Sequence, residues 1–535
     1  GGPALPRINT TSEGRTLQAL AGCHEHLLLE LERVAFLVRA QVWRARQVAD
    51  ADHPYRGHFI PEAEVDALLA RPDALPEWVR REAPLPPVEL RRVLDRIEAI
   101  IDARARAALQ AGHRPPLLAL RNNFALDRFQ YDAFLFALAV ELDSRFERLY
   151  AYLHDDVSRR RPSVDLLLNL GCSSAAERLR RRRDFTPEGV LLRAGLLVWE
   201  ADPNRAGGSS RLVGSLRVPE AVVDFLTASE PRPSCGELVN TPRPLSAWFG
   251  PDDVRARLRA VADELRTPSL EPATSAHQPG ATTICLRGSH GCGRRTAAEG
   301  IAESLGRPLL VVDLPAERSE EHVTEARRDA GLWGALLLWR WSAETLPPSA
   351  VASRGGSGIP RRIEFIAAPV DAPPLPQSRY EHALELSLPP LSTTSRRCVW
   401  ERALAPLGDT EALDLDTLAS RFRFGGDKIA QVAASLAGDD RERAEPLAAP
   451  AIYAASRRHS RVAVAGLASH ITPRRSWPDL ILAADIEEQL RLIERRVRHR
   501  TTVLETWGLG ARMPEARGTH ALFAGPPGTG KTLAA

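Results

Sequence analysis

The residues Gly525-Pro526-Pro527-Gly528-Thr529-Gly530-Lys531-Thr532 are the most informative stretch of this sequence. They match the motif Gly-x-x-x-x-Gly-Lys-Ser/Thr, in which backbone N–H groups hold phosphate oxygens, lysine reaches the β- and γ-phosphates, and the hydroxyl ligates Mg²⁺. The glycines let the backbone turn its N–H groups inward. A strand over His520 to Ala524 is expected before the loop, and the first turns of a helix after it. The stretch predicts a binding site for ATP and Mg²⁺ that includes the neighbouring Leu533, with Thr532 as the metal ligand.

The scarcity of lysine strengthens the interpretation of Lys531 as a phosphate-binding residue. Of the 71 cationic residues, only Lys428 and Lys531 are lysines, and all the others are arginines. Arginine runs therefore carry less functional weight here than usual. The net charge of +3 is small for this length, so bulk electrostatics does not argue for a nucleic-acid partner.

Length and composition are those of a multidomain globular protein. The 535 residues, 44% hydrophobic and 26% charged, suggest roughly three or four domains. No apolar run is long enough to span a bilayer and no signal pattern opens the chain, so we expect a cytoplasmic protein. Six scattered cysteines fit a reducing compartment. Cys23 and His26 could share a helix face beside His24, but two candidate ligands without a second pair rarely make a metal site.

The ends of the sequence suggest a piece of a longer protein. It begins Gly1-Gly2, its only methionine is Met513, and it stops at Ala535, three residues past the loop. No acidic pair follows Lys531, so we expect this chain alone to bind ATP without hydrolysing it.

A second loop of the same type lies earlier and has lost its ligand chemistry. A strand over 282–286 leads to Gly288-Ser289-His290-Gly291-Cys292-Gly293-Arg294-Arg295-Thr296 and then a helix. Arg294 takes the lysine position and Arg295 the hydroxyl position. A planar guanidinium does not replace a compact ammonium, and arginine cannot ligate a cation. We therefore expect this unit to be nucleotide-free; the alternative is that Arg294 holds phosphate weakly, as a charge only.

The rest of the first α/β unit agrees. The strand over 334–338 runs into Trp339-Arg340 where an acidic pair would be needed, and the strand over 363–368 ends in alanine instead of a polar residue. A small helical lid is expected over 395–440, followed by a basic linker to about Arg475. A second unit begins at Trp477-Pro478-Asp479-Leu480-Ile481, with a helix over 486–500.

The N-terminal third reads as helices followed by a small mixed module. An amphipathic helix is expected over 14–48, others near Pro61 and Pro87, and an aromatic-rich core over 124–154. Helices over 164–170 and 175–183, β-rich runs over 190–199 and 212–218, and a helix over 219–228 suggest a winged-helix module. Arg178 and Arg180 to Arg183 invite a DNA-binding interpretation; we favour a solvated arginine face, because acidic residues are interspersed.

The two tandem units, the first degenerate and the second carrying GPPGTGKT, resemble AAA-family ATPases. Trp477-Pro478-Asp479-Leu480 is similar to the segment that opens an AAA module, which implies that Asp479 and Leu480 lie beside the adenine. The motifs at Tyr55-Arg56-Gly57-His58-Phe59-Ile60, at Leu149-Tyr150-Ala151-Tyr152-Leu153-His154-Asp155-Asp156 and at Arg159-Arg160-Arg161-Pro162 resemble bacterial AAA ATPases encoded with phage-tail-like contractile injection systems.

The resemblance implies a multidomain α and α/β protein that couples ATP hydrolysis to remodelling or assembly of protein partners, hexameric when intact. The expected parts are a helical domain over 1–160, a winged-helix-like domain over 161–230, a linker region over 231–280 in which 267–280 is flexible, a degenerate AAA unit with lid over 281–455, and the start of a second AAA unit over 456–535. The alternative is a nucleic-acid-binding regulator with an ATPase switch. The degenerate unit keeps apolar strands without catalytic residues, which suggests an assembly platform; a passive spacer is the competing view.

Overall fold

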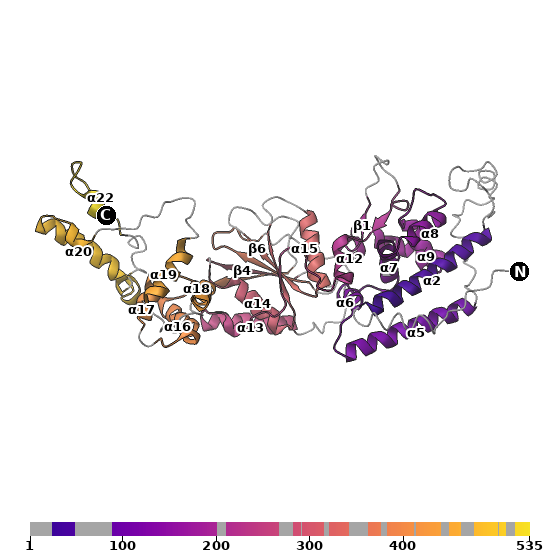
Figure 1. The fold of residues 1–535 in the computed structure, drawn as a ribbon, viewed down its shortest axis with the longest axis horizontal. Helices are drawn as coiled ribbons and strands as arrows, with labels where there is room; N and C mark the ends of the chain where they lie inside the picture. The colour runs from indigo at the N-terminus through magenta and orange to yellow at the C-terminus, as the bar shows by residue number, and fades with distance from the viewer. Residues whose placement is uncertain are drawn as a thin grey trace. The chain divides into compact units, whose positions relative to one another are not determined.

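The protein is described here by a computed structural model that covers residues 24–48, 88–200, 210–266, 282–289, 291–314, 320–341, 362–375, 382–410, 413–439, 449–461, 476–500, 502–509 and 519–534. The chain divides into two compact units, residues 1–390 and 391–535, and each is described by itself. Figure 1 shows the elements of both units. Within the described ranges, no helix has the length and apolar character needed to cross a membrane. The predicted helix near Pro61 and the motif 55–60 lie outside the described residues.

The first part of unit 1 is helical. Its elements are α2 (Glu25–Val48), α5 (Val88–Gln110), α6 (Pro116–Asn123), α7 (Arg128–Leu142) and α8 (Arg145–His154). Ten of the fifteen residues of α7 are buried, and α2 packs against α5, α7 and α8. The aromatic-rich stretch predicted as core is confirmed as core, since Phe129, Phe134, Phe136, Phe146 and Tyr150 are all buried.

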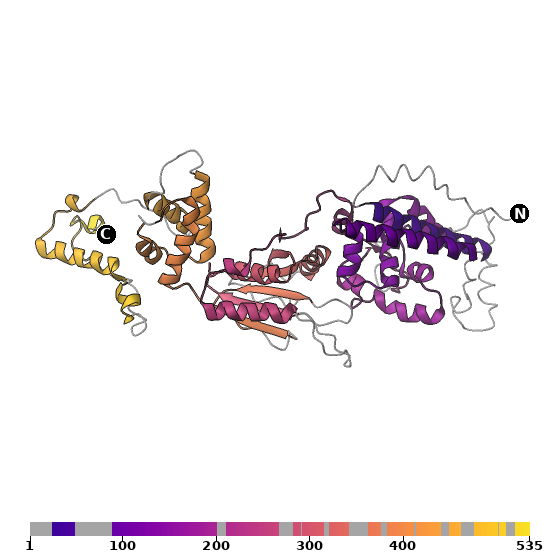
Figure 2. The same cartoon turned by 90° about the horizontal axis from the view of Figure 1, so that it is seen from below.

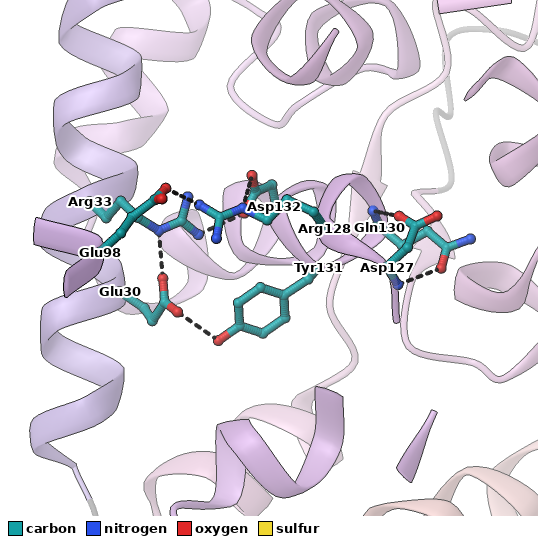
Figure 3. A network of polar contacts seen from close by, with 8 residues as sticks. All are labelled: Glu30, Arg33, Glu98, Asp127, Arg128, Gln130, Tyr131 and Asp132. Atoms are coloured by element: carbon teal, nitrogen blue, oxygen red, sulfur yellow. Dashed lines mark hydrogen bonds and ion pairs between the residues drawn. The ribbon is translucent and has the colours of Figure 1, made fainter. Parts of the chain in front are cut away.

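A buried polar network fixes α2 against α7 (Figure 3). Arg33 on α2 is 1% exposed and donates to Glu30 at 2.7 Å and to Asp132 at 2.6 Å. The Tyr131 hydroxyl donates to the other oxygen of Glu30 at 3.1 Å. Arg128 also donates to Asp132 and contacts Glu98 on α5, so three helices share the network. Because every buried charge has a partner, the network orients the helices at little net cost.

The second part of unit 1 shares one core with these helices. It contains α9 (Val164–Gly171), α10 (Ala175–Arg181), η1 (Arg182–Phe185), α11 (Val190–Arg193), the antiparallel pair β1 (Val198–Trp199) and β2 (Leu216–Arg217), and α12 (Glu220–Thr227). A single cluster of buried side chains runs from Leu27 through α7 to Leu226. The β-rich run predicted over 190–199 was partly wrong: Val190 to Arg193 form a helical turn, whose buried Val190 and Leu191 pack into that core.

The arginines of this region are partly tied down within the fold. Arg178 is 7% exposed and pairs with Asp165 and Asn169. Arg181 pairs with Asp127 and Asp184 and lies over the Phe129 ring. These two side chains hold α9, α10 and α7 together. The predicted solvated arginine face is therefore wrong for Arg178 and Arg181, whereas Arg180, Arg182 and Arg183 are exposed as predicted.

The α/β part of unit 1 is a six-stranded sheet. Its strands are β3 (Glu237–Val239), β4 (Thr282–Gly288), β5 (Leu309–Asp313), β6 (Leu336–Arg340), β7 (Ile363–Ala368) and β8 (His382–Leu388), in the order β3-β5-β6-β7-β4-β8. All neighbours are parallel except β3, which is antiparallel to β5. The chain steps to one side of β4 for β5, β6 and β7 and then crosses to the other side for β8. The direction therefore reverses at β4, and ligands of such sheets bind at the carboxyl ends of the strands beside this point.

Helices cover both faces of the sheet, as expected of parallel strands. One face packs on η2 (Leu245–Ala247), α13 (Asp252–Arg266) and α14 (Arg294–Ser304), and the other on α15 (Glu320–Leu332). Figure 1 shows α13 and α14 together below the strands. The predicted linker region over 231–280 is therefore wrong in its described part, because β3 pairs with the sheet and Leu258 of α13 is fully buried in its core. Residues 267–280 lie outside the described residues.

The turn after α15 docks on the N-terminal core. The Phe225 and Trp333 rings meet edge to face at 4.8 Å, and Leu332 is buried in the N-terminal cluster. The Asn123 side chain donates to the Leu332 carbonyl at 3.3 Å. The Phe124 ring packs so closely on Gly331 that a Cβ there would lie 2.4 Å from it. The helical region and the sheet of unit 1 are thus joined by an apolar contact at this corner.

Unit 2 begins with a helical body. It comprises α16 (Thr393–Leu404), η4 (Ala405–Leu407), α17 (Leu415–Arg421), α18 (Gly426–Asp439) and α19 (Ala449–Arg461), which gather in one cluster in Figure 2. Leu404, Ile429, Val432 and Trp400 are fully buried within it. The lid predicted over 395–440 extends further than expected, since α19 occupies part of the predicted basic linker. Its buried Ile452 and Ala455 explain why this arginine-rich stretch is helical. The unit continues with η5 (Trp477–Asp479), α20 (Ala484–Arg498), the turn η6 (Thr502–Thr506) and α22 (Lys531–Ala534).

Candidate nucleotide site

The loop 525–532 has the backbone that its glycines predict. Gly528 and Gly530 both have a φ of 82°, in the left-handed region that side chains other than glycine rarely adopt. A helical turn, α22, begins at Lys531. Backbone in this conformation directs successive N–H groups toward one point, which makes a concave anion site at the start of a helix.

The Lys531 side chain lies across its own loop. Its ammonium donates to the carbonyl of Gly525 at 2.9 Å and to that of Pro526 at 2.6 Å, and it lies 3.4 Å from the Thr529 hydroxyl. The Thr529 hydroxyl donates to the Pro526 carbonyl at 2.9 Å, which fixes the loop's shape. Thr532 and Leu533 are exposed on the first turn of α22. The ammonium and the Thr532 hydroxyl both lie at the start of α22, so the residues present fit a Mg²⁺–phosphate group.

The segment that opens the second unit is pinned to its helix. The Ser476 amide and hydroxyl both donate to Asp479, at 2.9 and 3.1 Å, which closes the single turn of η5. The Arg491 guanidinium of α20 lies 4.7 Å from the Trp477 ring centroid. Asp479 is thus a capping residue in this structure. The location of Asp479 and Leu480 beside a base stays a prediction.

The predicted strand over 520–524 is not a strand among the described residues. The segment has no sheet neighbour there, and Leu522 is 94% exposed. By contrast, β4, which precedes the earlier loop, is paired on both sides by β7 and β8. A parallel strand requires such neighbours, because its backbone groups have no partners within the strand.

The earlier loop, described at 288–289 and 291–295, has the same left-handed pair of glycines and different side-chain chemistry. Gly291 and Gly293 have φ values of 83° and 86°, and α14 begins at Arg294. Arg295 donates to both oxygens of Glu237 on β3, at 2.8 and 2.7 Å, and to Glu299 at 2.8 Å. The residue in the hydroxyl position is therefore held in two ion pairs, which raise the pKa of its guanidinium. Arg295 links α14 to the edge strand instead of ligating a cation.

Glu299 is the buried centre of this link. It is 2% exposed and also accepts a hydrogen bond from Arg243 at 2.6 Å. Burial alone would raise its pKa, but the hydrogen bonds from Arg243 and Arg295 outweigh burial and lower it. The carboxylate is therefore charged at neutral pH and fully paired.

The positions that would need acidic or polar groups hold packing residues. Trp339 is fully buried and donates to Glu364 at 3.2 Å, while Arg340 pairs with Asp313 at 2.7 Å across the ends of β6 and β5. Glu364 is fully buried near the start of β7, where Arg327 binds both of its oxygens. Burial opposes its ionisation, yet Arg327 and Arg362 hold the pKa of Glu364 at about 2. The Glu364 carboxylate therefore belongs to a structural ion pair. It lies near the amino end of β7, whereas Ala368 lies at the carboxyl end.

The sequence predicts both loops but not Glu237 and Glu299, the residues that bind Arg295 of the first loop. They were not predicted because nothing in the sequence indicates that β3 pairs with β5. An acidic residue four positions after an arginine on a helix, as in Arg295 and Glu299, is the one signal that could have found such a pair.

Of the three potential ligands near the N-terminus, for which the sequence did not favour a metal site, His24 and His26 lie in the described residues. His24 bonds to the Thr227 carbonyl at 3.0 Å, and His26 is buried. Cys23 lies outside the described residues. Across the ranges that the structure describes, no three His, Cys, Asp or Glu side chains come together as metal ligands would.

Comparison with known proteins identifies two parts of the chain. Residues 10–234 match the family model "Winged helix domain, variant", and residues 392–462 match "Contractile injection system ATPase helical domain". Residues 392–462 are thus similar to the helical domain of a contractile injection system ATPase. These residues make up the body formed by α16 to α19. The winged-helix model covers the preceding helices too, which agrees with their single shared core. The predicted class, a multidomain α and α/β fold with a winged helix and a helical domain after the sheet, is confirmed.

Solved structures add weak similarities. A chain described as "Structural Basis for Katanin Self-Assembly" aligns at 16% identity and a TM-score of 0.28, over 44% of this chain and 90% of that one. The Thermotoga maritima RuvB Holliday junction branch migration motor aligns at 13% identity and a TM-score of 0.31, over 52% of this chain and 86% of that one. A search of curated proteins gives no match.

Proposed function

We propose that this chain belongs to an AAA-type ATPase that couples ATP binding and hydrolysis to remodelling or assembly of protein partners, with a contractile injection system as the setting. The observation that carries the proposal is the loop 525–532. Its glycines have the required positive φ, its lysine is one of only two in the chain, and it begins a helical turn. The match of residues 392–462 to an injection-system ATPase domain supports the setting.

In this proposal each residue of the loop has a defined role. The backbone N–H groups from Gly528 to Lys531 hold phosphate oxygens, and Lys531 turns from its own carbonyls to the β- and γ-phosphates. The Thr532 hydroxyl would ligate Mg²⁺, which would neutralise negative charge on the phosphates. Pro526 and Pro527 stiffen the turn. Leu533, Asp479 and Leu480 border the rest of the nucleotide. The intact protein is a cytoplasmic homo-hexamer, as the family resemblance implies.

The nucleic-acid alternative has less support. Arg178 and Arg181 are bound within the fold, and the net charge is only +3. A salt-dependent binding measurement with duplex DNA tests it directly, because phosphate contacts give affinity that falls steeply with salt. We expect no such steep dependence.

The test of ATP binding uses a fluorescent ATP analogue with Mg²⁺ and the full 535-residue chain. We expect a dissociation constant in the micromolar range, about −8 kcal/mol. Lys531→Ala should weaken binding at least tenfold. Arg294→Ala, at the matching position of the first loop, is the control and should leave binding unchanged. Equal affinities for all three proteins would refute the assignment of the site.

The partner can be sought with the full-length protein. A variant whose second unit binds but does not hydrolyse ATP should hold its partner longer, so it is the bait of choice. Recovery of an injection-system component by this bait, and not by Lys531→Ala, is the expected result.

A further inference from the structure

The two loops are each preceded by the same arrangement of elements. The single-turn helices η2 and η5 span 245–247 and 477–479, and in each case a 15-residue helix begins seven residues after the start of that turn, α13 at Asp252 and α20 at Ala484. Trp248 directly follows the first turn and Leu480 the second. Both donate their amide to the first residue of the turn at 3.1 Å, to Leu245 and to Trp477. Trp248 therefore holds the same position relative to the loop 288–295 as Leu480 holds relative to the loop 525–532.

Trp248 is buried against the first loop. The side chain is 1% exposed, and its indole N–H donates to the Cys292 carbonyl at 3.2 Å. A Cβ added to Gly293 would lie 2.8 Å from the ring, so the indole touches the loop backbone where α14 begins. The ring also covers Gly250, and Arg255 of α13 donates to the Trp248 carbonyl at 3.4 Å. The indole is thus clamped between the loop and its own segment.

This contact has the character of a bound aromatic ligand. A nucleotide held by a phosphate loop presents a flat ring close to that loop, with polar edges that hydrogen-bond to backbone groups. The indole of Trp248 supplies a flat bicyclic ring, and its one polar edge is satisfied by a loop carbonyl. Gly293 is the loop residue that the ring approaches, and any side chain there would displace it.

We propose that Trp248 occupies, in the first unit, the place that a purine base takes in a nucleotide-binding unit. The indole of Trp248 then fills the space beside the loop 288–295, and the core around this loop is complete without nucleotide. The inference rests on the proposed function in one respect, namely that Leu480 borders the nucleotide in the second unit.

The first experiment transfers the feature to the second unit. Leu480→Trp in the full chain should weaken binding of the fluorescent ATP analogue at loop 525–532 at least tenfold, because the indole competes for the place of the base. Ile481→Trp is the control: it adds the same ring one residue later, at a position that is 94% exposed, and should change binding less than twofold. Unchanged binding by Leu480→Trp, with normal binding by the unmodified chain, would overturn the inference and leave the proposed function intact.

The second experiment needs no binding at the second loop. Trp248→Ala removes the indole, and adenosine, which carries no phosphate, is added at millimolar concentration. Adenosine should raise the melting temperature of this variant by several degrees through linkage, and should raise that of the unmodified chain much less. Trp339→Ala, which removes a buried indole from the opposite face of the sheet, is the control for a generic cavity and should show no adenosine effect. Free indole is added in a parallel measurement. The assignment would be overturned if indole but not adenosine raised the melting temperature of Trp248→Ala. It would also be overturned if adenosine raised the melting temperatures of Trp248→Ala and Trp339→Ala equally, or raised neither. If Trp248→Ala does not fold, the Leu480→Trp comparison decides.

Discussion

The described parts of the loops 288–295 and 525–532 share a pair of left-handed glycines and have opposite side-chain chemistry. Their paired glycines differ in φ by only a few degrees, 83° and 86° in the first loop against 82° and 82° in the second. In the second loop the Lys531 ammonium donates to carbonyls of its own loop, and the Thr532 side chain is exposed. In the first, Arg295 is committed to Glu237 and Glu299, and Trp248 covers the backbone. The comparison teaches that glycines preserve the loop's shape, while the adjacent side chains decide whether that shape binds a ligand.

The largest effect is expected on assembly. If the first unit serves as a platform, deleting it from the full-length protein should abolish rings, measured as mass in solution with ATP. The deletion should run from 231 to 390, because β3 and α13 pack into the core that a cut at 280 would leave exposed. Full-length Lys531→Ala is the control, since it removes nucleotide binding and keeps the platform. Rings of unchanged subunit number after the deletion would favour the passive-spacer view.

The next effect is on the stability of the six-stranded sheet, which contains β7. Glu364→Ala leaves Arg327 and Arg362 without their buried partner, and breaking such a pair typically costs about 3–5 kcal/mol. Arg340→Ala breaks an exposed pair in the same sheet and should cost less than about 1 kcal/mol. Denaturant unfolding of both variants measures the difference. Similar small losses would mean that Glu364 is not the structural centre of this unit.

A smaller effect sharpens the comparison between the loops. In a Lys531→Ala chain, Arg294→Lys with Arg295→Thr restores the motif of the first loop. We expect no return of ATP binding, because Trp248 still covers the loop and Trp339 and Arg340 still stand where an acidic pair would be needed. The double change should also cost about 1–2 kcal/mol, since Glu299 loses one of its two charged donors. Arg294→Lys alone is the matched control for stability. Micromolar ATP binding by the restored loop would show that its side chains alone had silenced it.

Sequence reasoning was accurate where a motif or a periodicity acts locally. The strand at 363–368 was placed with the correct bounds, and the left-handed glycines of both loops followed from residue type and spacing. The lost chemistry of Arg294 and Arg295 followed from what a guanidinium cannot do. None of these inferences required knowledge of what lies across the fold.

The predictions that failed depended on distant partners. Val190 to Leu192 form a short apolar run, which periodicity alone cannot assign to a strand or a helix. Their helical turn packs into the N-terminal core. Glu237 to Val239 are three residues whose pairing with β5 bridges about seventy positions of sequence. The segment 520–524 has a strand's composition, but composition cannot supply the neighbours that a parallel strand requires. Trp248 was passed over because a lone tryptophan after a proline-rich stretch has no motif.

The smallest predicted effect concerns the acid stability of the first loop. Glu237, paired with Arg295, has a pKa lowered from its ordinary value of 4.5, chiefly by the hydrogen bonds that Arg295 donates, and the pKa of Glu299 is lowered as well. Each folded-state pKa lies below the unfolded one. The stabilisation is therefore complete above about pH 4.5 and is lost as the pH falls through the folded-state pKa. Glu237→Gln should remove a small part of this dependence, because its carboxylate is mostly exposed and exposed pairs contribute little. Denaturant midpoints at pH 7 and at pH values below 4.5 measure it: the variant should be slightly less stable at pH 7 and should converge with the parent in acid. A stability difference between the Glu237→Gln variant and the parent that is the same at pH 7 and in acid would contradict the view that the first loop is held by an ion pair.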